Sequence, residues 1–230
     1  MSITNEQVEN YIKAIIPAWT SDATIGNVFA EQEAEAVRDG VPILNKTSVA
    51  YLRWLVQLRQ PKRMLEIGTA IGYSGLHLLQ ASPTATLITL ELDSERAAHA
   101  RGYFKAAGVN ERVTIVEGDA NETLDTLRDL EAFGEGFDFV FIDAAKGVYA
   151  TFFEKAIAMS VPGALLVSDN ILFRGLVAEE PTAVHRRHRG MVQKIKSYNE
   201  MLIQDERLNT VIVPIGDGFA LSVLKEAGLK

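Results

Sequence analysis

The spacing of apolar residues changes near residue 61. Up to residue 60, apolar side chains recur at helical intervals, as in Val8, Ile12 and Ile15. From Pro61 onward, short apolar runs alternate with helical stretches. An apolar period of about 3.6 residues is typical of an amphipathic helix, whereas short runs bounded by polar residues are typical of buried strands. We therefore expect a helical cap over residues 1–60 and an α/β core over residues 61–230.

Five apolar runs in the core region are spaced to leave room for a crossover helix between successive parallel strands. They read RMLEIGT, TLITLEL, RVTIVEGD, FDFVFIDAA and GALLVSDN. Strands that are buried on both faces are apolar throughout, as residues 139–142 are. This pattern predicts a doubly wound, Rossmann-like sheet whose strands are mostly parallel.

Two further apolar runs, TVIVPIGD and GFALSVLK, meet at Asp217–Gly218, a pair that suits a tight hairpin turn. They predict a C-terminal antiparallel hairpin that closes the sheet. Because no internal repeat or linker interrupts the pattern, we expect a single domain over residues 1–230.

Composition narrows the possible chemistry. The chain has no cysteine, which excludes disulfides, thiolate metal sites and a cysteine nucleophile. No stretch approaches the roughly 20 apolar residues of a membrane helix, and the N-terminus lacks the pattern of a secretory signal. We therefore expect a cytoplasmic protein without membrane contact. The net charge of −7 disfavours general nucleic-acid binding, although a basic patch on an acidic protein can still bind RNA.

Three strand ends carry residues suited to a nucleoside. Gly68 and Gly72 follow the first strand, Glu91 ends the second, and Asp119 with Ala120 follows the third. Glycine allows close approach of a ligand, a carboxylate accepts the two hydroxyls of a ribose, and an acidic turn accepts from an adenine amine. The G-x-x-x-G spacing differs from G-x-G-x-x-G, which favours a cofactor without phosphates over NAD. A glycine-rich turn can also serve packing alone, but three such ends together favour a binding crevice.

The fourth and fifth strands end in a set of hard oxygen ligands. Asp143 follows the fourth strand, and Asp169 with Asn170 follows the fifth. Two carboxylates and an amide suit Mg²⁺ or another divalent cation, while the lack of nearby His and Cys disfavours zinc. Either aspartate alone would more often cap a helix or turn. Their pairing on neighbouring strands favours a metal site.

These stretches resemble the Mg²⁺-dependent O-methyltransferases related to catechol and caffeoyl-CoA methyltransferases. The resemblance rests on LEIGTAIGYS, TLELD, FIDAAKGVY and SDNILFRGLV. Within that family, HRRHR, KIKSYN and VPIGDGFALS are most similar to the bacterial tRNA 5-hydroxyuridine methyltransferases. Plant caffeoyl-CoA enzymes carry Asp-Ala-Asp-Lys, whereas Ala145 stands at the third of these positions here, which argues against that substrate class.

The resemblance implies an S-adenosylmethionine (SAM) site and a metal centre. The cofactor contacts would be Leu44, Gly68, Thr69, Ser74, Glu91, Asp119, Ala120 and Asp143. The metal ligands would be Asp143, Asp169 and Asn170, with Lys146 or Asp143 taking the proton. We also expect a homodimer.

The acceptor is less narrowly defined. A catechol and 5-hydroxyuridine both present a hydroxyl beside a second oxygen, so one metal site can serve either. The absence of cysteine disfavours carbon methylation of uridine, which often needs a cysteine adduct. If tRNA is the acceptor, the expected phosphate contacts are Arg174, Arg186, Arg187, Arg189 and Lys194.

The basic stretch has another interpretation, since Met191, Val192, Ile195, Tyr198 and Leu202 keep helical spacing and would leave the cations on a solvated helix face. Three alternatives to the tRNA enzyme remain open at this point. They are a small-molecule catechol-type O-methyltransferase, an NAD-dependent oxidoreductase and a catalytically silent SAM-binding module.

Overall fold

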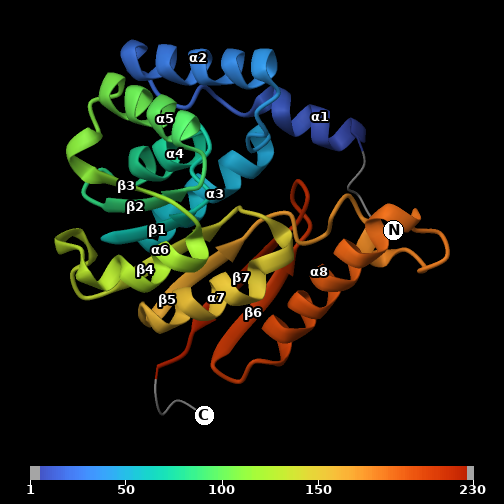
Figure 1. Ribbon diagram of the computed structural model, residues 1–230. Coiled ribbons are helices and arrows are strands. Elements are labelled where there is room, and N and C mark those ends of the chain that lie inside the picture. Colours follow the sequence, from blue (N-terminus) through green and yellow to red (C-terminus); the bar gives the residue numbers. More distant parts are fainter. Residues whose placement is uncertain (1–5, 227–230) are drawn as a thin grey trace.

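The computed structural model describes residues 6–226 and shows one twisted sheet between two layers of helices (Figure 1). The sheet has seven strands in the order β3-β2-β1-β4-β5-β7-β6. The strands are β1 (Arg63–Ile67), β2 (Thr86–Glu91), β3 (Val113–Glu117), β4 (Phe137–Ile142), β5 (Ser160–Ser168), β6 (Leu208–Val213) and β7 (Phe219–Leu224). β1 to β5 are parallel, and β7 pairs antiparallel with both β5 and β6. The predicted fold class is confirmed.

Three helices precede the first strand, as the apolar period predicts. The α-helices are α1 (Glu6–Ile15), α2 (Ala23–Asp39), α3 (Lys46–Arg59), α4 (Tyr73–Ala81), α5 (Ser94–Ala106), α6 (Ala120–Thr126), α7 (Tyr149–Ala158) and α8 (Arg186–Gln204). Short 3-10 turns are η1 (Asn110–Arg112), η2 (Leu127–Asp129), η3 (Glu131–Phe133), η4 (Lys146–Val148) and η5 (Leu176–Ala178). Within residues 6–226, no helix combines the length and the apolar character needed to cross a bilayer.

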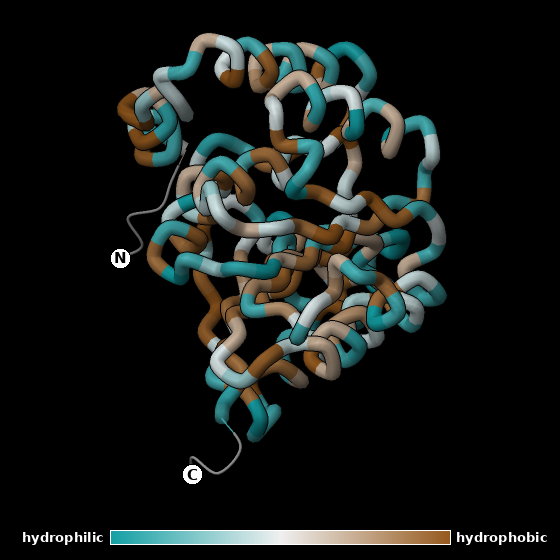
Figure 2. Tube along the Cα trace, turned by 90° about the vertical axis from the view of Figure 1, so that its left-hand side faces the viewer, coloured by the Kyte–Doolittle hydropathy of each residue, from teal (hydrophilic) through white to brown (hydrophobic). Residues whose placement is uncertain are grey.

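The side chains of each central strand pack into two hydrophobic cores, one on each face of the sheet. Phe139 and Phe141 of β4 pack with α3, α4 and α5, whereas Val140 and Ile142 pack on the opposite face with α6, α7 and α8. Successive strand residues point to opposite faces of a sheet, so both faces of β4 are buried. This explains the unbroken apolar runs in the sequence. Figure 2 shows hydrophobic residues concentrated along the central strands and hydrophilic ones along the outer helices.

The C-terminal hairpin differs from the expected tight turn. The connection between β6 and β7 runs from Pro214 to Gly218, and Gly216 and Gly218 have φ of 60° and 87°. It is longer than a two-residue turn because it also packs on the segment after β5. There the N–H of Ile171 donates to the carbonyl of Gly218 at 3.1 Å, and that of Leu172 to the carbonyl of Asp217 at 2.9 Å. The loop therefore reaches the carboxyl edge of the sheet.

The loops that follow β1 to β5 leave the sheet at one edge because these strands are parallel. The backbone ladder extends one residue into three of these loops. Gly68 N–H donates to the carbonyl of Leu90 at 3.1 Å, and Asp143 N–H to that of Ile67 at 3.0 Å. Asp169 N–H donates in the same way to the carbonyl of Ile142 at 3.0 Å. The first residues after β1, β4 and β5 are thus held in register, which fixes where their side chains begin.

Gly68→Ala tests this packing. Gly68 has φ of 106°, and a Cβ there would overlap the carbonyl oxygen of Asp143. We expect the variant to lose about 3 kcal/mol or more of unfolding free energy, measured by urea denaturation. The control is Gly102→Ala in α5, where a Cβ meets nothing within 4 Å, and which should be neutral or stabilising. Equal stability of the two variants would contradict the close approach.

Candidate active site

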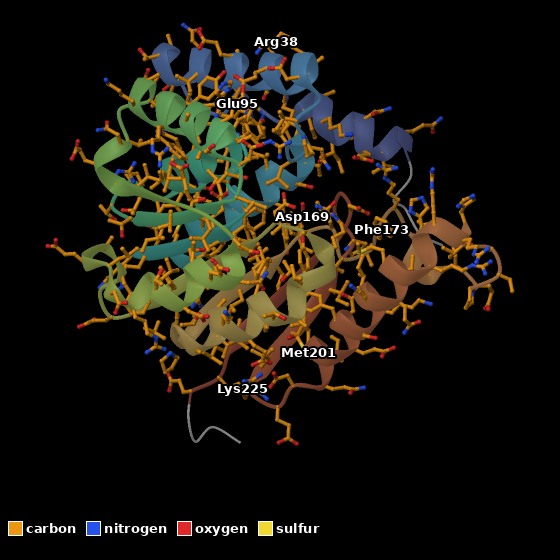
Figure 3. The ribbon with its side chains drawn as sticks, viewed as in Figure 1. Arg38, Glu95, Asp169, Phe173, Met201 and Lys225 are labelled. Carbon is orange, nitrogen blue, oxygen red and sulfur yellow. The ribbon has the colours of Figure 1, made fainter. Side chains whose placement is uncertain are left out.

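A cavity of about 760 Å³ opens at the carboxyl edge of the sheet, within the usual size of small-molecule sites. It brings together most of the residues singled out in the sequence, namely Leu44, Gly68, Thr69, Ser74, Glu91, Asp119, Ala120, Asp143, Lys146, Asp169, Asn170 and Arg174. Arg186, Arg187, Arg189 and Lys194 do not line it. In Figure 3, Asp169 and Phe173 are labelled between the helical cap and α8.

Glu91 is fixed across from the glycine-rich loop. One carboxylate oxygen accepts from the N–H of Ala70 at 2.7 Å, and the other from the N–H of Asp93 at 2.9 Å. The side chain is 8% exposed and lines the cavity. A carboxylate has about four lone-pair sites, so two backbone bonds leave capacity for the hydroxyls of a ribose.

Asp119 has a structural role in addition to its place in the cavity. Its Oδ1 accepts from the N–H of Asn121 at 2.8 Å and caps α6, which begins at Ala120. Helix capping by a strand-end aspartate, an alternative for this residue type, therefore applies here. This hydrogen bond holds Asp119 at the cavity wall.

Glu66 is a site residue that the sequence interpretation missed. It is fully buried in β1 and accepts from Ser74 Oγ at 2.5 Å and from Thr89 Oγ1 at 2.6 Å. Thr69 Oγ1 lies 2.6 Å from the same Thr89 hydroxyl. Burial raises the pKa of Glu66 to about 7. Glu66 thus holds Ser74 directly and contacts Thr69 only through the Thr89 hydroxyl. Its acidic side chain within the apolar run RMLEI was the available signal.

Asp143, Asp169 and Asn170 converge as expected. Asn170 Nδ2 donates to Asp169 Oδ2 at 2.9 Å and lies 3.2 Å from Asp143 Oδ1. Asn170 has φ of 60°, a left-handed conformation that turns its amide back toward the carboxylates. Neither aspartate is the N-cap of η4, α7 or η5, the helices that follow β4 and β5.

The electrostatics of this cluster favour a cation. Asp169 is 4% exposed, and its Oδ1 accepts no hydrogen bond from the residues that the structure describes. Burial and repulsion from Asp143 raise the pKa of Asp169 to about 8. Burial also raises the pKa of Asp143, opposed by the charge of Lys146 and the amide of Asn170. Two desolvated carboxylates side by side are costly unless positive charge is added.

A purely carboxylate or imidazole metal site is not present among residues 6–226, where no group of three or more His, Cys, Asp or Glu is placed to hold a metal. The candidate set is two carboxylates and one amide, which are oxygen donors once the Asn170 amide is turned about its last torsion. Such donors are those preferred by Mg²⁺.

The far end of the cavity carries an aromatic ring and a guanidinium. Phe173 and Arg174 have φ of 46° and 57°, and both line the cavity. The N–H of Arg174 donates to the carboxylate of Asp217 in the β6–β7 loop. The ring of Phe173 meets that of His188 in α8 edge-on, with centroids 5.8 Å apart. Two consecutive non-glycine residues with positive φ are strained, and strain of this kind clusters at binding sites.

The basic stretch forms the first turns of α8, beside the cavity. That first turn contains no acidic residue, and Val192, Ile195, Tyr198 and Leu202 are buried as the helical spacing predicts. Arg189 Nε donates to the carbonyl of Val184 at 2.9 Å, so part of its role is local. The ammonium of Lys194 lies 3.4 Å from the position that a Cβ on Gly147 would take, next to Lys146.

Comparison with known proteins decides the family. A family model described as O-methyltransferase matches residues 30–225. The chain belongs to the O-methyltransferase family. A catechol O-methyltransferase of Niastella koreensis is 34% identical over 229 residues, which cover 96% of this chain and 97% of that relative.

Solved structures of this family have the same fold. An O-methyltransferase of Bacillus cereus in complex with SAH (S-adenosylhomocysteine) has a TM-score of 0.79 and 28% identity, covering 95% of this chain and 97% of that one. An O-methyltransferase of Streptomyces achromogenes in complex with SAM has a TM-score of 0.75 and 30% identity, covering 96% of each chain. The resemblance read from the sequence motifs is confirmed at the level of the family.

Glu66→Gln tests the buried carboxylate through pH. In the folded protein the pKa of Glu66, about 7, lies above the ordinary glutamate value of 4.5. The stability that Glu66 gives the wild type is therefore lost as pH rises through this range. The unfolding free energy of the wild type minus that of the variant should fall by about 3 kcal/mol between pH 4.5 and 7.5. Denaturant titrations of the ligand-free proteins measure this difference, and a constant value would contradict it.

Proposed function

We propose that this protein transfers the methyl group of SAM to a hydroxyl oxygen of an aromatic acceptor held beside a divalent cation. The observation that carries this proposal is the cluster of Asp143, Asp169 and Asn170 in the same cavity as Glu91. A nucleoside site and a hard-oxygen site within one cavity are what metal-assisted methyl transfer needs. Membership of the O-methyltransferase family supports it.

The cofactor would lie along the ends of β1, β2 and β3. Glu91 would accept the ribose hydroxyls, Asp119 and Ala120 would meet the adenine, and the methionine end would lie against Leu44, Gly68, Thr69 and Ser74. Glu66 would hold Ser74 directly and Thr69 through the hydroxyl of Thr89. The bound SAH and SAM of the Bacillus cereus and Streptomyces achromogenes relatives support the choice of cofactor.

The metal proposal rests on the close approach of two desolvated carboxylates, Asp169 and Asp143. Among residues 6–226 nothing donates to Oδ1 of Asp169, and burial raises the pKa of both groups, which fits a ligand that supplies positive charge. Asp143, Asp169 and Asn170 would hold Mg²⁺ or another divalent cation. When bound, such an ion lowers the pKa of an acceptor hydroxyl and stabilises the resulting oxyanion.

The protein's own groups would then move the proton and exclude water. Lys146 Nζ would accept the hydroxyl proton, with Asp143 as the second candidate. The acceptor oxygen forms a bond to the methyl carbon while the carbon–sulfur bond breaks, which leaves S-adenosylhomocysteine. Holding the oxygen about 3–3.5 Å from the methyl carbon removes much of the barrier. Phe173 would stack on the acceptor ring and shield it from solvent.

A small catechol-like acceptor has the stronger support, because the Niastella koreensis relative is a catechol O-methyltransferase over nearly the same length. The second candidate is 5-hydroxyuridine at the wobble position of tRNA, with 5-methoxyuridine as the product. The observation that favours it is the basic start of α8, with Arg186, Arg187 and Arg189 and no acidic residue in its first turn.

A homodimer stays a prediction, and the exposed side chains of Trp54 and Leu58 in α3 would suit a contact between two copies of the chain.

Asp169→Ala tests the metal cluster. The variant should lose methyl transfer to a catechol panel by at least about a hundredfold, because an oxygen ligand is removed, while its affinity for SAH stays within a few-fold. Labelled SAM and calorimetry measure the two quantities. Asp205→Ala, which removes a carboxylate that pairs with Arg207 away from the cavity, should keep wild-type activity. Full activity of Asp169→Ala, or activity of the wild type after exhaustive chelation, would overturn the metal centre.

Replacing Arg186, Arg187 and Arg189 with Ala separates the two acceptors. If tRNA is the substrate, the triple variant should show a strongly raised KM for tRNA and a shallower salt dependence, because each lost phosphate contact lowers the slope of log K against log salt by about 0.7–0.9. Its rate with catechols and its affinity for SAH should hold. The assay uses bulk tRNA lacking 5-methoxyuridine. If the wild type does not label this tRNA but labels catechols, the tRNA candidate is wrong.

A further inference from the structure

Two helices, α7 and α8, contact the segment after β5 that carries Asp169 and Asn170. Tyr149 of α7 donates its hydroxyl to the carbonyl of Asp169 at 3.2 Å. In α8, the Tyr198 hydroxyl lies 2.6 Å from Ser168 Oγ, and Asn199 Nδ2 donates to the carbonyl of Ile171 at 2.9 Å. Three polar side chains therefore contact the backbone or side chains on both sides of the two candidate metal ligands.

The peptide group between Ile171 and Leu172 is fixed at both of its ends. Asn199 Nδ2 donates to the carbonyl oxygen of Ile171. The N–H of Leu172, at the other end of this peptide group, donates to the carbonyl of Asp217 at 2.9 Å. The preceding peptide N–H, of Ile171, donates to the carbonyl of Gly218 at 3.1 Å. Asn170, just before these groups, has φ of 60°. Asparagine adopts this left-handed conformation more readily than most residues, and the hydrogen bonds of Ile171 and Leu172 fix the turn that follows it.

Asn199 is an expensive residue for stability alone. Asparagine is a poor helix former, and this one lies near the C-terminal end of the 19-residue helix α8. Its Oδ1 is buried and accepts no hydrogen bond from the described part of the chain. An unsatisfied buried acceptor is destabilising. A leucine of similar shape would remove that unpaired oxygen but would leave the carbonyl of Ile171 without its donor, so the contribution of Asn199 is its bond to Ile171.

We propose that Asn199 is a positioning residue for the metal cluster. By holding the carbonyl of Ile171, it sets the orientation of the turn and hence the convergence of Asp169 and Asn170. This inference rests on the proposed function, since it assumes that these side chains bind a divalent cation. It assigns to α8 a role that is separate from the basic residues at the start of the same helix.

The test replaces Asn199 with Leu, which keeps the approximate shape and removes the amide. Mn²⁺ binding is titrated without substrate by the electron paramagnetic resonance signal of the free ion. The Tm, the affinity for SAH and kcat are measured separately for the same variants. Removing a group that orients a metal ligand typically costs 10–100-fold in metal affinity or activity. We therefore expect the Kd for Mn²⁺ to rise and kcat to fall, each by about tenfold or more, with SAH affinity unchanged.

Ser82→Ala is the matched control. The Ser82 hydroxyl is buried and donates to the carbonyl of Pro61 at 3.0 Å, away from the cavity. The control removes one buried hydrogen bond to a backbone carbonyl, as Asn199→Leu does, and should leave Mn²⁺ affinity and kcat at wild-type values. If Asn199→Leu does not fold, Asn199→Ser gives the same readouts, because its hydroxyl is too short to reach the Ile171 carbonyl.

The outcomes separate this inference from the function on which it rests. Wild-type binding of Mn²⁺ with unchanged affinity and kcat in the Asn199 variant overturns the positioning role alone. An equal loss in Ser82→Ala also overturns it, because the effect would then follow from general destabilisation. If the wild type binds no Mn²⁺, the metal centre is wrong and the inference falls with it.

Discussion

The close approach of the β1 and β4 loops underlies the cavity. Gly68 lies so near the carbonyl of Asp143 that no side chain fits between them, and the N–H groups of both residues extend the ladder of the sheet. Because these strand ends are fixed against each other, the glycine-rich loop and the candidate metal ligands share one wall. Any ligand that lies along the loop is then presented to Asp143 and Lys146. The sheet, and not the loops, therefore sets the distance between the glycine-rich loop and the candidate metal ligands.

The helical cap supports the glycine-rich loop at the other side of the cavity. Gln32 of α2 is fully buried and donates to the carbonyl of Ile71 in the glycine-rich loop at 3.0 Å. The hydroxyl of Tyr73, the first residue of α4, donates to the carboxylate of Glu33 in α2 at 2.8 Å. α2 therefore braces the loop from outside the sheet. Leu44, in the connection to α3, completes the lining on this side.

The part of the cavity around Asp169 and Asn170 is built differently, from elements far apart in the sequence. Asp169 and Asn170 follow β5, and Asp217 belongs to the hairpin loop that binds the same turn. Asn199 reaches that turn from α8. Several strained residues, among them Phe173 and Arg174, are concentrated here. Strain held in place by long-range contacts is consistent with a site whose geometry matters more than its contribution to stability.

Residue spacing was sufficient to predict the sheet, the helical cap and the strand-end residues that meet in the cavity. Apolar runs report burial on both faces of a strand, and the carboxyl ends of parallel strands meet at one edge, so Gly68, Glu91 and Asp143 could be placed together without coordinates. Periodicity also assigned the inner face of α8. These inferences need only local spacing and the rule of the open sheet.

Tertiary structure alone decided which polar groups support the site. Glu66 is hidden within an apolar run and matters because Ser74 and Thr89 fold onto it. The hairpin loop is longer than a tight turn because Ile171 and Leu172 bind it. In the sequence, nothing distinguishes Asn199 from the other polar residues of an amphipathic helix, and its role follows from the hydrogen bond of its amide to Ile171. Such contacts join residues distant in sequence, and the spacing of apolar residues carries no record of which backbone carbonyl a buried amide will meet.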